Sequence, residues 1–322
     1  MDYIPLTGPL TYDSFFIVGV QETSPENLLS LLRTKNGGYK RYLGSPLRYA
    51  GGKSWAVGYI AEHIPRGVKR VVSPFFGGGS LEIALSKVAG FEVLGYDIFD
   101  ILVNYWQVQI SDPEALYQEL SLLKPDKETY EMVKSALRSH WRAEAFIEDN
   151  VRLAAYYYFN HNLSYGPGFL GWLSSVYANE EVYRRMLEKV RNFSPGNLWV
   201  EVSDFRLSLP EHKNDFLYLD PPYYLGEESD LFIGLYPMRN FPVHHHGFPH
   251  LELRNLLDNH RGGFLLSYND SPVIREWYKD FRIVELRTSY TMGQGETRVG
   301  KNRMASGRDN RKVGKELLII GC

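Results

Sequence analysis

Cysteine is almost absent from the 322-residue sequence, because the only one is the last residue, Cys322. This excludes a disulfide framework and a thiolate metal cluster, and it indicates a reducing, cytosol-like compartment. The sequence also lacks any apolar run near the roughly 18–20 residues that span a bilayer. Its beginning, MDYIPLTGPL, lacks the basic and apolar regions of a signal peptide. These absences predict a cytoplasmic protein without a membrane partner.

Excess positive charge is missing as well: the formal net charge is −2, which argues against a strongly basic nucleic-acid binder. The charge is uneven, however, because residues 295–316 carry seven Lys or Arg against three acids. A second basic cluster lies in RTKNGGYKR, residues 33–41. Runs of charge are usually solvated loops, so neither cluster by itself predicts a nucleic-acid contact.

Strand-like and helix-like segments alternate at both ends of the chain, which is typical of βαβ units and a mostly parallel sheet. The expected strands are Val68–Ser73, Phe91–Asp97, Phe216–Asp220, Gly263–Tyr268, Arg282–Leu286 and Glu316–Ile320. The expected helices between them are Ser54–His63, Ser80–Ala89, Ile98–Gln109, Leu251–Asn259 and Pro272–Tyr278. The predicted fold class is therefore α/β.

The middle of the chain, residues 111–197, has helical patterns and no convincing strand. The helices expected there are Pro113–Leu123, Lys127–His140, Ala145–Asn160 and Glu180–Phe193. A helical insert in an α/β domain is commonly a substrate-reading module, although its many aromatic residues also suit a plain helical core. We expect a core of residues 46–110 and 198–322, the insert 111–197, and an N-terminal extension, 1–45, that fits neither.

A glycine turn follows the first expected strand in VVSPFFGGGSLEIAL, residues 71–85. Glycines let the backbone approach a ligand closely, and the helix that opens near Ser80 presents free N–H groups. The spacing is not that of the dinucleotide fingerprint, so a nicotinamide cofactor is disfavoured. The next strand ends at Asp97, where an acid suits either the ribose hydroxyls of a nucleoside cofactor or the N-cap of a helix.

The segment SPLRYAGGKS, residues 45–54, partly matches the sequence motif of a phosphate-binding loop. A phosphate loop needs glycine at position 47, where this chain has leucine, so that reading fails by spacing. What remains is a Gly-Gly turn that leads into a helix, with Arg48, Tyr49 and Lys53 around it.

The segment DFLYLDPPYYLG, residues 215–226, runs an apolar strand into an acid, two prolines and two tyrosines. In open α/β sheets, ligands bind beyond the carboxyl ends of the strands, so Asp220 and Tyr223 would lie where chemistry usually happens. The alternative is a strand-ending turn in which Asp220 hydrogen-bonds only the backbone. This peptide alone does not decide between the two.

Taken together, the segments LRYAGGK, PFFGGGS, the GYD strand end and LDPPYY resemble the D12 class of DNA adenine-N6 methyltransferases, the Dam-like enzymes of the α group. The order of the motifs matches, with the cofactor motifs first, a target-recognition insert next and the catalytic tetrapeptide last. The resemblance covers about residues 46–104 and 204–322. It implies a Rossmann-like methyltransferase sheet, S-adenosylmethionine as cofactor, and DNA as partner. One residue departs from the pattern, because the acid that often precedes Pro-Phe is here Ser73.

The resemblance also implies a role for each matching residue. Asp220, Pro221, Pro222 and Tyr223 would form the catalytic loop that holds the target base. The cofactor would be bound by Tyr49, Lys53, Phe75, Gly77, Gly79, Asp97, Asp204, Phe205 and Asp220. Contacts to DNA are expected from Arg48, Arg239, Arg298, Lys301, Arg303, Arg308 and Arg311.

The function that follows is methyl transfer to the N6 amine of an adenine flipped out of a specific DNA sequence. Asp220 and the Pro221 carbonyl would accept hydrogen bonds from the amine, and Tyr223 would stack on the base. An RNA or single-strand adenine methyltransferase stays open. So does a non-catalytic DNA-binding relative, although the intact motifs argue against it. An N4-cytosine enzyme is disfavoured, because that group usually has serine in place of Asp220.

Two further features concern partners. The histidines at 244–246 and 250 have no carboxylate or cysteine at helical spacing, so we expect a loop that enters a helix rather than a metal site. A companion restriction endonuclease is compatible with this enzyme class. The sequence does not indicate an oligomeric state.

Neutralising Arg303, Arg308 and Arg311 together is expected to weaken DNA binding and to flatten its dependence on salt. Each lost phosphate contact removes released counterions, so the slope of log affinity against log salt becomes smaller. Titration of DNA at several salt concentrations measures this slope. An unchanged slope would contradict a DNA contact by this basic segment.

Overall fold

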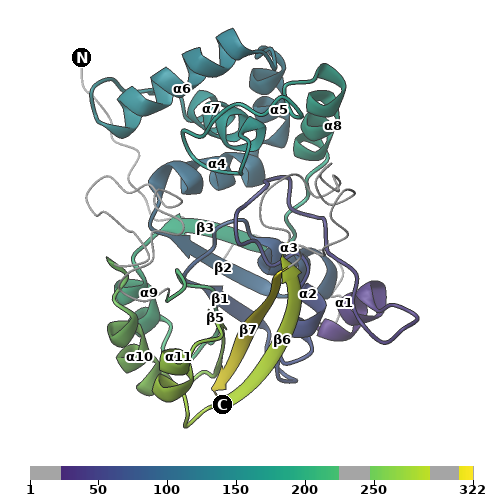
Figure 1. Ribbon diagram of the computed structural model, residues 1–322, viewed down its shortest axis with the longest axis vertical. Coiled ribbons are helices and arrows are strands. Elements are labelled where there is room, and N and C mark those ends of the chain that lie inside the picture. The colour runs from purple at the N-terminus through teal and green to yellow at the C-terminus, as the bar shows by residue number, and fades with distance from the viewer. Residues whose placement is uncertain (1–22, 225–246, 291–311, 322) are drawn as a thin grey trace, which may run out of the picture.

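A seven-stranded sheet forms the centre of the molecule (Figure 1). The computed structural model describes residues 23–224, 247–290 and 312–321, with only the backbone for 287–290 and 312–315. The strands are β1 (Arg70–Ser73), β2 (Glu92–Asp97), β3 (Leu198–Val202), β4 (Phe216–Leu219), β5 (Phe264–Asn269), β6 (Arg282–Tyr290) and β7 (Lys312–Gly321). Their order is β3-β2-β1-β4-β5-β7-β6. The first five are parallel, whereas β7 runs antiparallel to both neighbours.

Helices cover both faces of this sheet. One face packs against α9 (Phe205–Glu211), α10 (His250–Asp258) and α11 (Pro272–Trp277). The other packs against α1 (Pro25–Leu32), α2 (Val57–Ala61), α3 (Ser80–Ala89) and α4 (Asp100–Ser111). Successive strand residues enter opposite cores: Leu265 lies in one and Leu266 in the other. Burial on both faces explains why the central strands read as continuous apolar runs.

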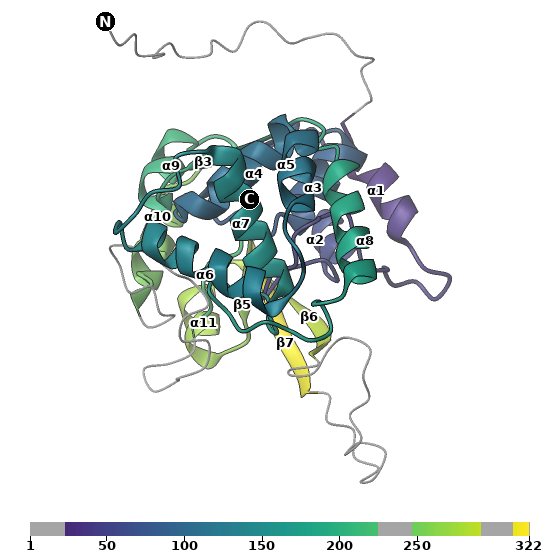
Figure 2. The same cartoon turned by 90° about the horizontal axis from the view of Figure 1, so that it is seen from above.

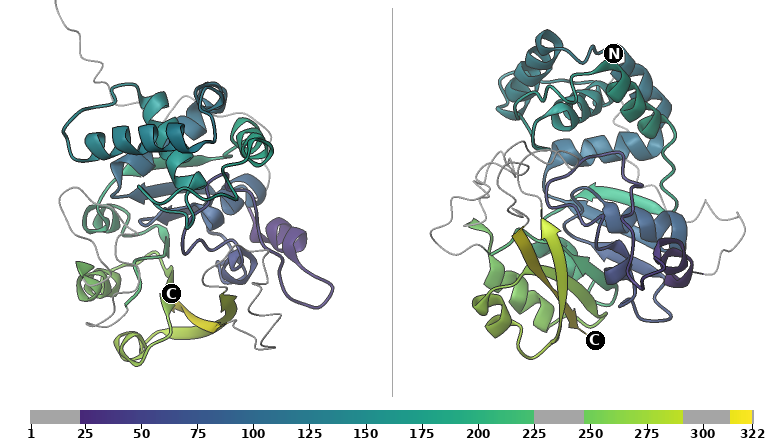
Figure 3. Two further views of the ribbon diagram at one scale, coloured as in Figure 1. Left: turned by 45° about the horizontal axis from the view of Figure 1, so that its top comes forward. Right: turned by 45° about the vertical axis from the view of Figure 1, so that its right-hand side comes forward.

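The helices of the middle region gather beyond the β3 edge of the sheet (Figures 1 and 3). They are α5 (Pro113–Ser121), α6 (Lys127–Trp141), α7 (Asn150–Leu163) and α8 (Glu180–Arg191). Seen from above, α5 and α7 lie beside α4 (Figure 2). Each begins at a side-chain cap, for example Asp149, whose carboxylate accepts from the amides of Val151 and Arg152.

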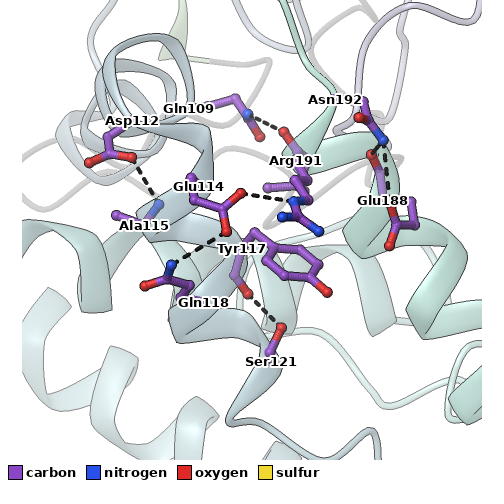
Figure 4. Close-up of polar contacts among 11 residues, drawn as sticks. Gln109, Asp112, Glu114, Ala115, Tyr117, Gln118, Ser121, Glu188, Arg191 and Asn192 are labelled. Atoms are coloured by element: carbon purple, nitrogen blue, oxygen red, sulfur yellow. Dashed lines mark hydrogen bonds and ion pairs between the residues drawn. The ribbon is translucent and has the colours of Figure 1, made fainter.

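Polar contacts tie α4, α5 and α8 together (Figure 4). Arg191 Nε donates to Glu114 Oε2 at 2.8 Å, and its guanidinium lies 4.9 Å from the centre of the Tyr117 ring. Gln109 Nε2, which is buried, donates to the carbonyl of Val190 at 2.9 Å. These contacts fix the insert against the helix that follows β2, so the insert and the sheet share one continuous apolar core.

The structure confirms the predicted α/β class and every expected strand, with ends shifted by a few residues. Three of the described elements were missed, namely α1, β3 and α9. Strand β3 buries only Leu198 and Val200, because its other face is exposed at the edge of the sheet, so it has no apolar run. Helix α9 is short and starts at the Asp204 cap. Helix α7 begins at Asn150, five residues after the predicted start at Ala145, because Asp149 caps it there.

Part of the N-terminal extension has a clear structural place. Helix α1 buries Leu28 and Leu32 in the main core, and the Ser24 amide donates to the carbonyl of Ala89 at 3.0 Å. Residues 1–22 lie outside the described part of the chain. The division into core, insert and extension stays a prediction.

Candidate functional site

The candidate site lies at the carboxyl ends of β1 and β4, two neighbouring parallel strands. Val71 and Val72 of β1 pair with Phe216 and Leu217 of β4. The order of the strands reverses here, since β2 and β3 follow on one side of β1 and β5 on the other side of β4. Doubly wound sheets bind ligands at this switch point. The glycine turn follows β1 and Asp220 follows β4, so the topology brings the two strongest motifs together.

The glycine turn is fixed by contacts to its backbone. Gly77 and Gly79 have φ angles of 49° and 62°, in the left-handed region that favours glycine. The Gly77 amide donates to Asp97 Oδ2 at 3.0 Å, and Trp106 Nε1 donates to the Gly77 carbonyl at 2.9 Å. A methyl group at Gly78 would lie 2.5 Å from Tyr49 Cβ. The turn is therefore shaped to let Tyr49 lie directly on its backbone.

Asp97 serves first as a backbone acceptor. Besides the Gly77 amide, its carboxylate accepts from the amide of Phe99 at 3.0 Å. Burial raises the pKa of Asp97, although these hydrogen bonds oppose the rise. A carboxylate can accept about four hydrogen bonds, so the capacity to accept from ribose hydroxyls remains. Asp97 can therefore accept from the backbone amides and still bind the ribose of a cofactor. Ribose binding stays a prediction.

A buried ion pair joins the other two motifs. Lys53 Nζ lies 2.7 Å from Asp220 Oδ1 and 2.8 Å from Oδ2, and it also donates to the Gly51 carbonyl at 3.1 Å. The side chain of Lys53 is 6% exposed and that of Asp220 21% exposed. Burial raises the pKa of Asp220, whereas the Lys53 ammonium opposes this rise. The same ammonium lies 4.9 Å from the centre of the Tyr223 ring.

The loop that follows Asp220 is held by the neighbouring strand. Asn269 Nδ2, at the end of β5, donates to the carbonyl of Tyr224 at 2.7 Å. The Tyr224 ring packs edge-on against His250 at 5.4 Å and Trp277 at 5.2 Å. Tyr224 therefore anchors the loop, while Tyr223 lies on the Lys53 side. Between Asp220 and these rings, Pro221 is buried and Pro222 half-buried.

A cluster of aromatic rings borders the glycine turn. Phe75, Phe205 and Phe248 lie 5.3–5.6 Å apart between ring centres. Asp204 caps α9 and binds Arg206 through two hydrogen bonds of 2.9 and 2.6 Å. Burial raises the pKa of Asp204, but the hydrogen bonds from Arg206 outweigh it and hold the pKa below its ordinary value. Phe205 is thus placed near the glycine turn, and the cofactor roles of both residues stay predictions.

Arg48 packs against the insert. Its guanidinium donates to the carbonyls of Asn162 and Ser164, and it stacks 3.7 Å from the centre of the Tyr177 ring. It therefore caps the end of α7 and joins the segment 48–53 to the insert. Its contact with DNA stays a prediction. The other residues predicted to bind DNA lie outside the described residues: Arg239, Arg298, Lys301, Arg303, Arg308 and Arg311.

Glu82 is a residue of this site that sequence reasoning missed. It lies in the first turn of α3, is 2% exposed, and accepts from the Ser73 hydroxyl at 2.7 Å. An acid thus reaches the end of β1 from the helix, beside the serine that departs from the family pattern. Burial raises the pKa of Glu82 to about 7. The signal was available, because Glu82 interrupts the apolar run SLEIAL.

Replacing Glu82 with glutamine is expected to stabilise the protein at pH 8 by about 3 kcal/mol, because burial raises the pKa of this carboxyl to about 7. The folded-state pKa is raised from 4.5 to about 7, so ionising the buried carboxyl destabilises the fold as pH rises through this window. Below pH 4.5 the carboxyl is protonated in both states, and the advantage of glutamine disappears. Urea unfolding between pH 4.5 and 8 measures the effect. A difference that does not change with pH would contradict the assigned pKa.

Neither a metal site nor a membrane span is found in the described residues. No group of three or more His, Cys, Asp or Glu side chains there could hold a metal ion. His244, His245 and His246 lie outside this part of the chain, whereas His250 begins α10 and bonds Tyr268 through Nδ1 at 2.7 Å. No described helix is long and apolar enough to cross a bilayer.

Comparison with known proteins identifies the family of the chain. Residues 49–292 match the family described as D12 class N6 adenine-specific DNA methyltransferase. The type II methyltransferase M1.LlaDCHI of Lactococcus lactis subsp. cremoris is 25% identical over 270 residues, which cover 79% of this chain and 91% of the relative. The type II methyltransferase M.MjaIII of Methanocaldococcus jannaschii is 26% identical over 199 residues, 55% and 68% of the two chains. The family match spans both the glycine turn and the Asp220 loop, and the chain therefore belongs to the D12 class of N6-adenine-specific DNA methyltransferases.

Proposed function

We propose that this enzyme transfers a methyl group from S-adenosylmethionine to the N6 amine of an adenine that is flipped out of a specific DNA sequence. The observation that carries the proposal is the position of Asp220. Its carboxylate lies at the end of β4, next to the strand that leads into the glycine turn. Acceptor and cofactor cradle would then face one space at the switch point of the sheet.

The charges of the site fit this cofactor. Asp220 and Glu82 are carboxyl groups that interact electrostatically; burial raises the pKa of each, and the charge of Lys53 opposes the rise. When both are ionised, they exceed the single ammonium. S-adenosylmethionine carries a sulfonium, an ammonium and one carboxylate, so its net positive charge suits this surplus. Tyr49, the glycine turn, Asp97 and Phe205 would hold the rest of the molecule.

The cofactor supplies an electrophilic methyl group, and the chain must aim the nucleophile at it. The N6 nitrogen of adenine is a poor nucleophile, because its lone pair is delocalised into the ring. Hydrogen bonds from the amine to the Asp220 carboxylate and the Pro221 carbonyl would favour a pyramidal nitrogen. Fixing the reacting groups in line removes up to roughly 7–11 kcal/mol of barrier in ideal cases. The carboxylate also stabilises the positive charge that develops on nitrogen.

The remaining residues of the site hold this acceptor in place. Lys53 orients the Asp220 carboxylate through both oxygens, and the two prolines stiffen the loop. An adenine within a duplex cannot reach the loop, so it would be flipped out at a few kcal/mol. Stacking on Tyr223 would recover about 1–3 kcal/mol.

The wider assignments follow from the same enzyme class. The helical insert, residues 111–197, would read the target sequence, and the basic segment 295–316 would contact phosphates. Both relatives are named type II methyltransferases, which supports a companion restriction endonuclease for this chain. We place the enzyme in the cytoplasm, together with the DNA that it would modify.

The substrate can be identified by competition. The enzyme is given equal amounts of duplex DNA, single-stranded DNA and RNA together with labelled S-adenosylmethionine, and the label in each is measured. We expect label in duplex DNA, and we expect the fluorescence of 2-aminopurine at the target position to rise on binding. Faster labelling of RNA or of single strands would favour the alternative adenine methyltransferase. Binding without any labelling would favour a non-catalytic relative.

A further inference from the structure

Glu316 on β7 is a buried carboxylate that the proposed mechanism does not yet use. The residue is 2% exposed, and neither carboxylate oxygen makes a hydrogen bond of ordinary geometry within the described residues. Burying an ionisable group without hydrogen-bond partners destabilises the fold, so a buried carboxylate of this kind calls for an explanation. Burial raises the pKa of Glu316, and the charge of Lys53 opposes the rise.

The position of Glu316 in the sheet places it behind the catalytic loop. It pairs across the sheet with Asn269 of β5, whose amide holds the Tyr224 carbonyl at 2.7 Å. Because side chains alternate along a strand, Glu316 lies on the same sheet face as Leu318, which belongs to the core of α2 and α3. Lys53, which precedes α2 of that core, lies close enough for its ammonium to oppose the rise in the pKa of Glu316.

One polar neighbour of Glu316 is the hydroxyl of Tyr223. This hydroxyl is buried, and it lies close enough to Glu316 for each group to change the pKa of the other. The face of the same ring lies 4.9 Å from Lys53 Nζ. Lys53 also binds Asp220, so the carboxylate of Glu316, the ring and the catalytic acid belong to one connected group.

We propose that Glu316 is a positioning residue for methyl transfer, whose carboxylate accepts the hydroxyl hydrogen of Tyr223 and sets the angle of the ring on which the target adenine stacks. The proposal rests on the base-holding role proposed for Tyr223. A fixed ring angle matters because small errors in alignment of the amine lower the rate strongly. Glu316 acts only through Tyr223, so its removal should affect the DNA substrate and leave cofactor binding intact.

A double-mutant cycle of Glu316→Gln and Tyr223→Phe tests this coupling. Each substitution keeps the shape of the side chain: Tyr223→Phe removes the donor, and Glu316→Gln removes the charge of the acceptor. We expect each single variant to lower kcat/KM for DNA by about tenfold, as for the loss of one hydrogen bond to a charged group. The double variant should lose no more than either single variant. Affinity for S-adenosylmethionine should stay within twofold, as should all values for the control Glu285→Gln, a carboxylate on the adjacent strand β6.

Losses that multiply in the double variant, to about a hundredfold, would overturn the proposal, because independent residues behave in this way. A parallel loss of cofactor affinity in Glu316→Gln would also overturn it. If that variant folds poorly, Tyr223→Phe decides alone, since unchanged kcat/KM there removes the supposed role of the hydroxyl. The Asp220→Ala variant separates this proposal from the proposed function. Methyl transfer that survives in Asp220→Ala contradicts the proposed function itself. If Asp220→Ala is inactive but Glu316→Gln has normal activity, only the role of Glu316 is contradicted.

Discussion

Replacing Asp220 with alanine is expected to lower methyl transfer by about a thousandfold or more, at the upper end of the range for removing one group that stabilises transition-state charge. The N6 amine then loses the acceptor that aims its lone pair and stabilises its developing charge. Binding of S-adenosylmethionine should stay measurable, because the glycine turn and Asp97 are held by contacts that do not involve Asp220. Single-turnover methylation and equilibrium binding of the cofactor measure the two effects separately.

Asp215 provides a matched control for this experiment. It lies immediately before β4, at the opposite end of the strand from Asp220, and its carboxylate accepts from His212 Nδ1 at 2.8 Å. Asp215→Asn should therefore retain most of the activity. Substantial turnover in Asp220→Ala would contradict the assignment of the catalytic acid.

Replacing Lys53 with methionine is expected to destabilise the fold by about 3 kcal/mol near neutral pH, the cost of leaving a buried carboxylate without its partner. Both oxygens of Asp220 face the Lys53 ammonium, and the two side chains are largely buried. Removing both charges in Lys53→Met with Asp220→Leu should restore much of the stability, because an apolar pair can replace a buried ion pair. Urea unfolding of the single and double variants measures both effects.

The loss of stability in the Lys53→Met variant should also depend on pH. Burial already raises the pKa of Asp220, and the missing ammonium would raise it further. As pH falls through this raised pKa the carboxyl takes up a proton, so the penalty should shrink toward acid pH. A double variant that is less stable than Lys53→Met would contradict the view that the unpaired Asp220 charge causes the loss.

Apolar runs and helix-ending glycines predicted much of the fold, because burial and backbone conformation at these positions depend on the residues nearby in the sequence. The apolar run before Asp220 is buried on both faces of β4, as its composition indicated. The helix predicted over Ser80–Ala89 was correct at both ends, since Gly79 and Gly90 take left-handed conformations there. Strand β3 could not be found in this way, because an edge strand with one exposed face has little apolar signal.

The candidate site was predictable only as separate motifs. Lys53 and Asp220 are 167 positions apart, and their contact depends on how the segment before α2 folds over the switch point. The burial of Glu316 depends on where the antiparallel strand β7 pairs with β5. Likewise, Arg48 faces α7 because the insert folds back against it, a contact across 114 positions. Such long-range pairs leave no spacing pattern in the sequence.

The departure at Ser73 shows how structure can explain a missing motif residue. The acid expected before Pro-Phe is absent, but Glu82 brings a buried carboxylate to the same strand end and binds the serine hydroxyl. The two positions are nine residues apart and lie on a strand and a helix, so only the fold relates them. We therefore expect Glu82 to contribute to the charge that surrounds the cofactor.

Nucleoside analysis of treated DNA tests the central claim most directly. Unmodified genomic DNA is incubated with the full chain and S-adenosylmethionine, digested to nucleosides and examined by mass spectrometry, with the Asp220→Ala variant as the blank. We predict N6-methyl-2′-deoxyadenosine as the one new nucleoside, formed at a limited set of identical sequence sites and absent from the blank. Formation of N4-methyl-2′-deoxycytidine, or equal amounts of methylated adenine in the blank, would contradict the account.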